Sequence, residues 1–206
     1  MIIKNPIFCL LIFLLTGCSY QVKPVIPQYS PDVSNVIHGN AKIKFAGNFD
    51  KLDGQVYNDS NISCRAMTFS ITMKDEFQRS VRRLINAKFV SLNSESNFYD
   101  IEITLEDFRA AFRDLMEQSF LNFGTSAPPP ELNADAQLQL LVVVKKNGKT
   151  VIDRKVNGYE SKNFTYWSCG DAARKVQKVT EIAAKRILES IDRYALAPLS
   201  SPRTSN

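Results

Sequence analysis

The sequence lacks most of the patterns that mark an enzyme. It contains no GxSxG motif, no glycine-rich nucleotide loop and no cluster of metal-ligating residues. Its one histidine, His38, lies in a polar, proline-spaced segment, where a solvated side chain is the ordinary interpretation. We therefore predict no catalytic residues, no metal site and no cofactor. Paired carboxylates leave no linear motif, so a carboxylate-based cell-wall hydrolase is the minor alternative.

Long hydrophobic runs are also absent. No run reaches the roughly 20 apolar residues that a membrane-spanning helix needs. The main apolar run, 7–15, follows Lys4 and is followed by Thr16, Gly17 and Cys18. A positive start, a short apolar centre and small residues are typical of an export signal. Leu-Thr-Gly-Cys at 15–18 resembles a bacterial lipobox. The alternative is an ordinary cleaved signal followed by a coincidental cysteine.

The lipobox resemblance implies that residues 1–17 are removed as a lipoprotein signal peptide. The Cys18 thiol would take a diacylglyceryl group, and the new N-terminus an acyl chain. Each buried CH₂ contributes about 0.8 kcal/mol, so several chains form a stable anchor. Ser19, and not Asp, follows Cys18, which in Gram-negative lipoproteins implies sorting to the outer membrane, facing the periplasm. This covalent lipid is the only non-protein group that we expect.

The four cysteines then separate into two kinds. Cys9 lies in the signal and Cys18 takes lipid, which leaves Cys64 and Cys169 in an oxidising compartment. We predict a disulfide between them, closing a loop of about 105 residues. The alternative is two buried free thiols.

The charge is moderately basic, with 26 Lys and Arg against 21 Asp and Glu, or +5. Loss of Lys4 with the signal lowers the net charge to +4. Export argues against a nucleic-acid partner. Two basic groups could face anionic lipid or lipopolysaccharide, although a solvated face is the ordinary interpretation. They are Arg79, Arg82 and Arg83, and Lys145, Lys146 and Lys149.

The chain divides into three parts after the signal. Residues 18–40 are polar, with Pro24, Pro27 and Pro31 spaced through them, and predict a flexible tether behind the lipidated cysteine. Residues 41–196 suit one periplasmic domain. Residues 197–206 are predicted to be a disordered tail.

Within the domain, apolar residues alternate at 41–49, 64–71, 99–106 and 134–146, which predicts strands. Asn147-Gly148 predicts a hairpin to a strand over 150–159. Apolar residues at helical spacing follow Thr72, a candidate N-cap, and predict one helix. A second helix is predicted after the candidate caps near 168–171. The acids at 100, 102 and 106 invite a catalytic interpretation, but a solvated sheet face is the ordinary one.

The segment 108–123 does not fit this plan, because its apolar spacing suits either a helix or a continuing strand. It either covers the core or a sheet edge, or forms a lip over an acyl chain or a surface for a partner. We treat its apolar residues as candidate contacts for a partner or lipid. They are Phe108, Phe112, Leu115, Met116, Phe120 and Phe123.

The order of elements, together with the lipobox, resembles the YajG-type lipoproteins. It is also similar to auxiliary lipoproteins of ABC transporters and to lipoproteins that activate penicillin-binding proteins. The matching stretches are the helix 77–87, the strand 100–105, the hairpin 146–149 and the helix 172–191. The longer segment 108–130 and the Cys64/Cys169 pair depart from the YajG-type pattern.

The resemblance implies an α/β fold of the α+β two-layer kind, with an antiparallel-rich sheet and two helices on one face. It also implies a binding or assembly role. We therefore expect a non-catalytic interaction module of the cell envelope that docks on an envelope protein complex. The alternative is an accessory of an envelope transport system that handles lipid or lipopolysaccharide.

Overall fold

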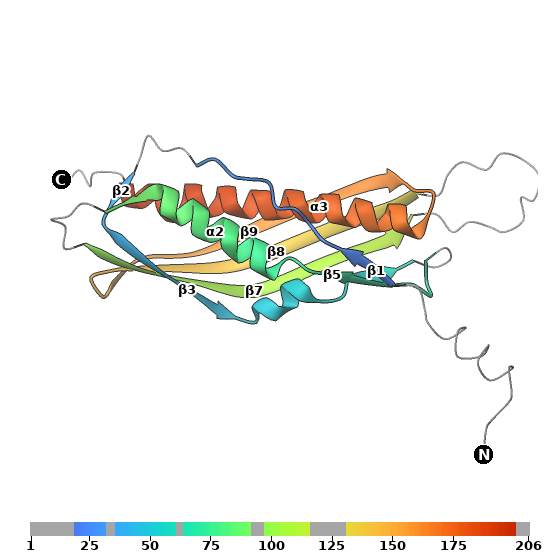
Figure 1. Cartoon of the computed structure of the whole chain (residues 1–206), viewed down its shortest axis with the longest axis horizontal. Coiled ribbons are helices and arrows are strands. Elements are labelled where there is room, and N and C mark those ends of the chain that lie inside the picture. Colours follow the sequence, from blue (N-terminus) through green and yellow to red (C-terminus); the bar gives the residue numbers. More distant parts are fainter. Residues whose placement is uncertain (1–18, 32–35, 61–63, 92–96, 116–130, 201–206) are drawn as a thin grey trace, which may run out of the picture.

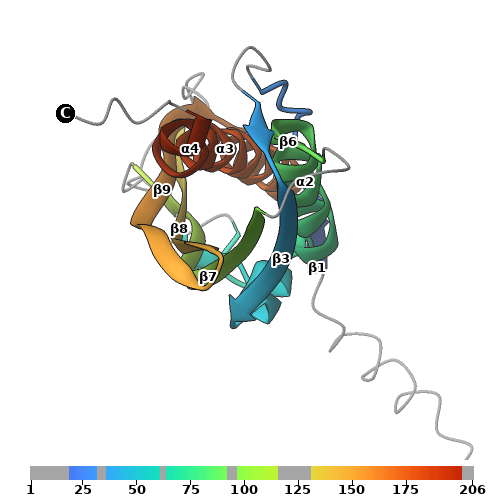
Figure 2. The same cartoon turned by 90° about the vertical axis from the view of Figure 1, so that its left-hand side faces the viewer.

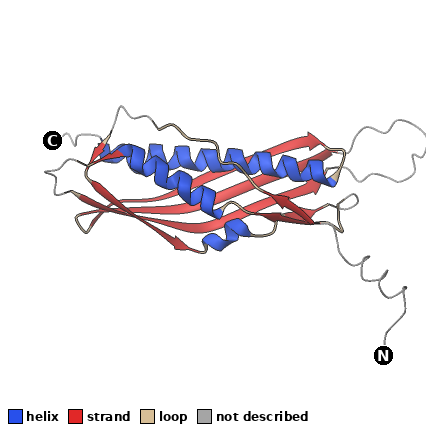
Figure 3. Ribbon diagram, in the orientation of Figure 1, coloured by secondary structure: helices blue, strands red, loops and turns tan. Residues whose placement is uncertain are grey.

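A computed structural model describes residues 19–31, 36–60, 64–91, 97–115 and 131–200. The fold is α+β, with a mixed, antiparallel-rich sheet and two long helices packed on one face, as predicted (Figures 1 and 3). Viewed from one end, the sheet curves, and α3 (Cys169–Ser190) lies across its concave side (Figure 2). The helix α2 (Lys74–Lys88) lies beside the first sheet strand, β3 (Asn40–Gly47).

Three long strands form the body of the sheet: β7 (Phe98–Asp114), β8 (Glu131–Lys146) and β9 (Lys149–Thr165). They pair antiparallel, and the Asn147-Gly148 hairpin adopts the positive φ angles that this turn requires. On the other edge of β7, β3 and the short β4 (Tyr57–Asp59) both run parallel to it. The 3-10 helix η1 (Phe49–Asp53) follows β3 in the chain.

A β-bulge in β7 explains why the segment beginning at Phe108 was ambiguous in the sequence. Ile101, Ile103 and Leu105 are buried, and the register then shifts between Leu105 and Asp107. One extra residue exchanges the two faces of a strand. The even-numbered Ala110 and Phe112 consequently lie in the core.

Both predicted helices form, but only one uses the predicted cap. Ser168 caps α3, its hydroxyl accepting a hydrogen bond from the Asp171 amide at 3.1 Å. Thr72 does not cap α2. Instead, Asp53 of η1 accepts hydrogen bonds from the amides of Met73 and Lys74 at 2.8 and 2.9 Å. A cap supplied from twenty residues upstream has no local sequence signature.

The predicted flexible tether is wrong for the described residues of that segment, which pack on the domain. Strand β1 (Ser19–Val22) pairs in parallel with β5 (Thr68–Ile71), and β2 (Ile37–His38) pairs with β6 (Phe89–Val90). Val22, Ile26 and Ile37 are each at most 3% exposed. Extended backbone accommodates prolines, so proline spacing did not distinguish a free linker from a packed strap.

The end of the domain also differs from the prediction of a tail from 197 onward. The last helix continues through a π-helix, η2 (Ile191–Leu196), into the short α4 (Ala197–Ser200), whose Leu199 packs against the core. Residues 201–206 lie outside the described residues.

The helix α3 lies very close to the sheet. A Cβ atom built on Gly158 of β9 would lie 2.2 Å from the Ala183 carbonyl oxygen of α3, so only glycine fits this contact.

A buried polar cluster joins three distant segments. Lys88 Nζ lies 2.8 Å from Asp192 Oδ1, and Tyr29 donates a hydrogen bond of 2.8 Å to Asp192 Oδ2. Lys88 and Asp192 are 3% and 5% exposed. Burial, followed by the hydrogen bond to Asp192, raises the pKa of Tyr29 to about 12. The cluster connects the N-terminal strap (the described residues 19–31), the end of α2 and the π-helix η2.

Candidate functional site

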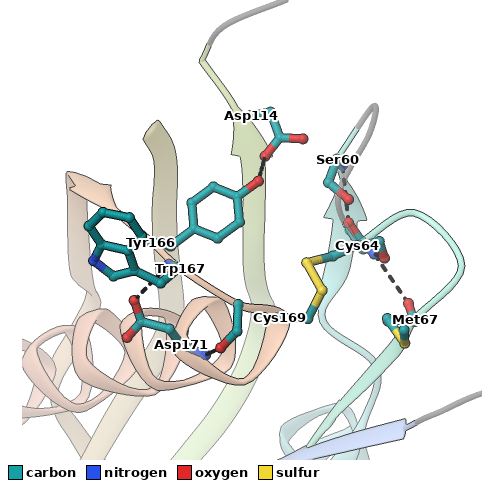
Figure 4. Close-up of a disulfide and its surroundings, with 10 residues drawn as sticks. Ser60, Cys64, Met67, Asp114, Tyr166, Trp167, Cys169 and Asp171 are labelled. Carbon is teal, nitrogen blue, oxygen red and sulfur yellow. Dashed lines mark hydrogen bonds between the residues drawn. A yellow bond between two sulfur atoms is a disulfide. The ribbon is translucent and has the colours of Figure 1, made fainter. Parts of the chain in front are cut away.

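A disulfide at the end of the molecule where α3 begins brings the two predicted cysteines together (Figures 1 and 4). Cys64 and Cys169 are joined across a sequence separation of 105, with their Cα atoms 5.6 Å apart. Cys64 precedes β5, and Cys169 begins α3. The bond therefore fixes the loop before β5, and through β5 the strand β1, to the start of α3.

Side-chain hydrogen bonds order the chain around this disulfide. The Asn58 amide nitrogen donates to the carbonyls of Cys64 and Met67 at 2.8 and 3.1 Å. Tyr166 donates to Asp114 Oδ1 at 2.7 Å, tying the connection after β9 to the end of β7 (Figure 4). This end of the domain, including the backbone at Tyr166, is held by contacts from several elements.

Trp167 lies at the same end and is 79% exposed. Its backbone N–H donates to Asp171 Oδ2 at 3.3 Å, so the indole projects from an anchored backbone. It is the only tryptophan in the chain. The position of Trp167 directly before a helix cap was the one sequence signal that could have identified it as a candidate functional residue.

The structure separates the predicted contact residues. Phe112 is 1% exposed and packs edge-on against Phe69, with ring centroids 4.8 Å apart. It is a core residue, and the prediction of a partner or lipid contact is wrong for it. Phe108 is half-buried and Leu115 is 42% exposed. The remaining candidates, and the lipidation site, lie outside the described residues: Met116, Phe120, Phe123 and Cys18.

Phe108 belongs to an open groove of about 660 Å³ beside β7. Phe108 and Ala110 supply apolar lining, and the exposed ring of Tyr57 lies on the β4 side. We call this surface the β7 groove. Its full lining comprises Lys51, Gly54, Gln55, Tyr57, Asp59, Phe108, Arg109, Ala110 and Arg113.

Three cations, Lys51, Arg109 and Arg113, line the β7 groove, against one acid, Asp59. The Arg109 guanidinium lies 5.6 Å from the centre of the Tyr57 ring. Among the described residues, none of the three cations forms an ion pair. Unpaired cations beside an aromatic ring and an apolar lining suit a ligand that combines negative charge with an apolar group.

The acidic side chains of β7 that could have been catalytic are half-buried or exposed, and two of them pair with lysines. Glu102 lies 3.0 Å from Lys44, and Glu106 lies 2.9 Å from Lys155. Across the described ranges, no three His, Cys, Asp or Glu side chains are grouped so that they could hold a metal ion.

The two predicted basic groups lie apart from the β7 groove. On α2, Arg79 pairs with Glu76, and Arg82 lies 4.9 Å from the centre of the Phe45 ring. Lys145 and Lys149 are exposed at the hairpin of β8 and β9. None of the helices in the described part of the chain has the length and apolar character needed to cross a membrane.

Comparison with known proteins gives structural likenesses only, since no family model and no curated protein matches the chain. A DUF330 protein from Xanthomonas campestris is 13% identical, covering 86% of this chain and 94% of that one, with a TM-score of 0.48. A minor lipoprotein from Acinetobacter baumannii is 9% identical, covering 73% and 96%, with a TM-score of 0.36. Rare lipoprotein B from Shewanella oneidensis is 15% identical, covering 66% and 92%, also with a TM-score of 0.36. At these identities and scores, the likenesses assign no function to the chain.

Proposed function

We propose that this chain is a lipid-anchored envelope protein facing the periplasm from the outer membrane, and that it acts as a non-catalytic docking module. The observation that carries the docking role is the β7 groove, whose lining combines an aromatic ring and apolar side chains with three cations that form no ion pair among the described residues. The anchoring role rests on the signal pattern of residues 1–18.

The partner that best suits the groove is an envelope protein presenting an acidic segment with an apolar side chain. Arg109 and Arg113 can each hold a carboxylate through two parallel hydrogen bonds. Phe108 and Tyr57 offer apolar area of the kind that concentrates binding energy in protein interfaces. Asp59 would disfavour a uniformly acidic ligand and so adds selectivity.

Lipid handling is less well supported. A phosphate could also bind the cations, but an acyl chain needs an apolar cavity that encloses it. Phe112, one of the aromatic residues expected to contact such a chain, is buried in the core. The groove is open and carries charged residues on its lining.

In-cell crosslinking tests this proposal. A photo-reactive amino acid replaces Tyr57, which is 58% exposed on the groove, and the adduct is identified by mass spectrometry. We expect an adduct to an acidic segment of an envelope protein. Arg109→Glu combined with Arg113→Glu should reduce its yield about tenfold, which corresponds to about 1.4 kcal/mol.

The matched control is Lys145→Glu with Lys149→Glu, the same charge change at the hairpin, which should leave the yield unchanged. An adduct to lipid or lipopolysaccharide would support the lipid-handling alternative instead. Equal yields from both double variants would refute docking through the groove.

A further inference from the structure

The position of β1 fixes where a lipid anchor on Cys18 would leave the domain. Ser19, the residue directly after Cys18, already pairs with Thr68 in the parallel β1–β5 ladder. Consecutive Cα atoms are about 3.8 Å apart. Little chain therefore separates the anchor from the folded domain.

Trp167 lies at that same end of the molecule. The Tyr20 ring stacks on Phe69 with ring centroids 5.4 Å apart, and its Cε1 atom lies 3.2 Å from where a Cβ on Gly170 would be. Gly170 is in the first turn of α3, three residues after Trp167. Figure 1 shows β1 and the start of α3 at one end of the elongated domain.

This end also exposes Leu115, directly after β7. Its backbone N–H donates to the Glu131 carbonyl at 3.0 Å, and Glu131 is paired with Thr165, two residues before Trp167. The exposed indole and leucine thus project from neighbouring, hydrogen-bonded backbone. An apolar side chain with a polar tip, such as tryptophan, is enriched at the membrane–water interface.

We propose that the end of the domain bearing Trp167 and Leu115 rests in the headgroup region of the membrane that its own lipid anchor enters. This inference rests on the proposed lipidation of Cys18. The domain then stands on the membrane with α3 directed away from it. The 22 residues of α3 span about 33 Å, so the hairpin of β8 and β9, at the other end of the domain in Figure 1, projects into the periplasm.

Tryptophan fluorescence tests this orientation, because Trp167 is the only tryptophan in the chain. The full-length, processed protein is purified from membranes, and its lipid is verified by intact mass. It is then placed in phosphatidylcholine–phosphatidylglycerol vesicles with or without brominated acyl chains. We expect Trp167 of the lipidated protein in vesicles to emit at shorter wavelength than Trp167 of the unlipidated protein in detergent-free buffer. Its emission should lose intensity when the acyl chains are brominated.

The matched control moves the tryptophan to the opposite end. Trp167→Phe combined with Phe98→Trp leaves one indole at the start of β7, where the native side chain is 60% exposed. This position lies beside the hairpin, because the Phe98 carbonyl accepts a hydrogen bond from the backbone N–H of Asn147. In this variant, aqueous iodide should quench the emission, and brominated lipid should not.

The outcomes separate the two proposals. If iodide quenches Trp167 in the lipidated protein and brominated lipid does not, the proposed orientation is overturned, whereas the proposed lipidation of Cys18 is retained. If brominated lipid quenches both indoles equally, the upright orientation is also overturned. If the intact mass shows no lipid, the anchor fails and the orientation fails with it.

Discussion

Removal of the Cys64–Cys169 disulfide should destabilise the domain strongly. In the chain-entropy model, a cross-link closing a loop of 105 residues restricts the unfolded chain by about 4.8 kcal/mol at 25 °C. Folded domains are commonly stable by about 5–15 kcal/mol. Cys64→Ala with Cys169→Ala should therefore remove a large part of the total and lower the melting temperature by roughly 10–20 °C.

Urea unfolding followed by circular dichroism measures this loss. The dependence of the unfolding free energy on urea should also steepen in the double variant, since an unfolded chain without the cross-link exposes more surface. Native protein treated with dithiothreitol should match the double variant. A loss below about 1 kcal/mol with an unchanged urea dependence would refute the entropic argument.

Three further changes test the packing of the fold. Lys88→Met should cost about 3–5 kcal/mol because it leaves the buried Asp192 carboxylate without its cationic partner, whereas adding Asp192→Leu should restore most of the loss in urea titrations. The pKa of Tyr29 is raised to about 12, so its contribution to the free energy of unfolding is complete below pH 10 and is lost as the pH rises through 12. The urea midpoint should therefore fall over this pH range more in the native chain than in Tyr29→Phe. Gly158→Ala should lower stability by about 1–3 kcal/mol in thermal unfolding, since the new Cβ meets the Ala183 carbonyl; an unchanged melting temperature would contradict the close contact.

Much of the domain could be predicted because the signals are local. Asn147-Gly148 specifies its own turn, and alternation over 134–146 specifies a half-buried strand. Cysteine counting paired Cys64 with Cys169 because the expected signal and lipidation accounted for Cys9 and Cys18. In each case, neighbouring residues or simple elimination carried the information.

The errors arise where distant contacts decide the structure. The bulge after Leu105 depends on the partner strand, so the sequence could not show that Phe112 turns inward. Val22 and Ile26 alternate inward on the strap, but Pro24 between them concealed that pattern. The β7 groove combines Lys51 and Tyr57 with Arg109, and only the tertiary fold brings these residues together.

Charge exchange with the crosslinked partner tests the docking account most directly. Arg113→Glu should weaken the in-cell adduct formed from position 57, and a compensating Asp→Lys or Glu→Lys change in the partner's crosslinked acidic segment should restore it. Restoration confined to the acidic position facing residue 113 is the predicted result. If no such change restores the adduct, or if Arg113→Glu leaves it at full yield, the β7 groove is not the docking surface.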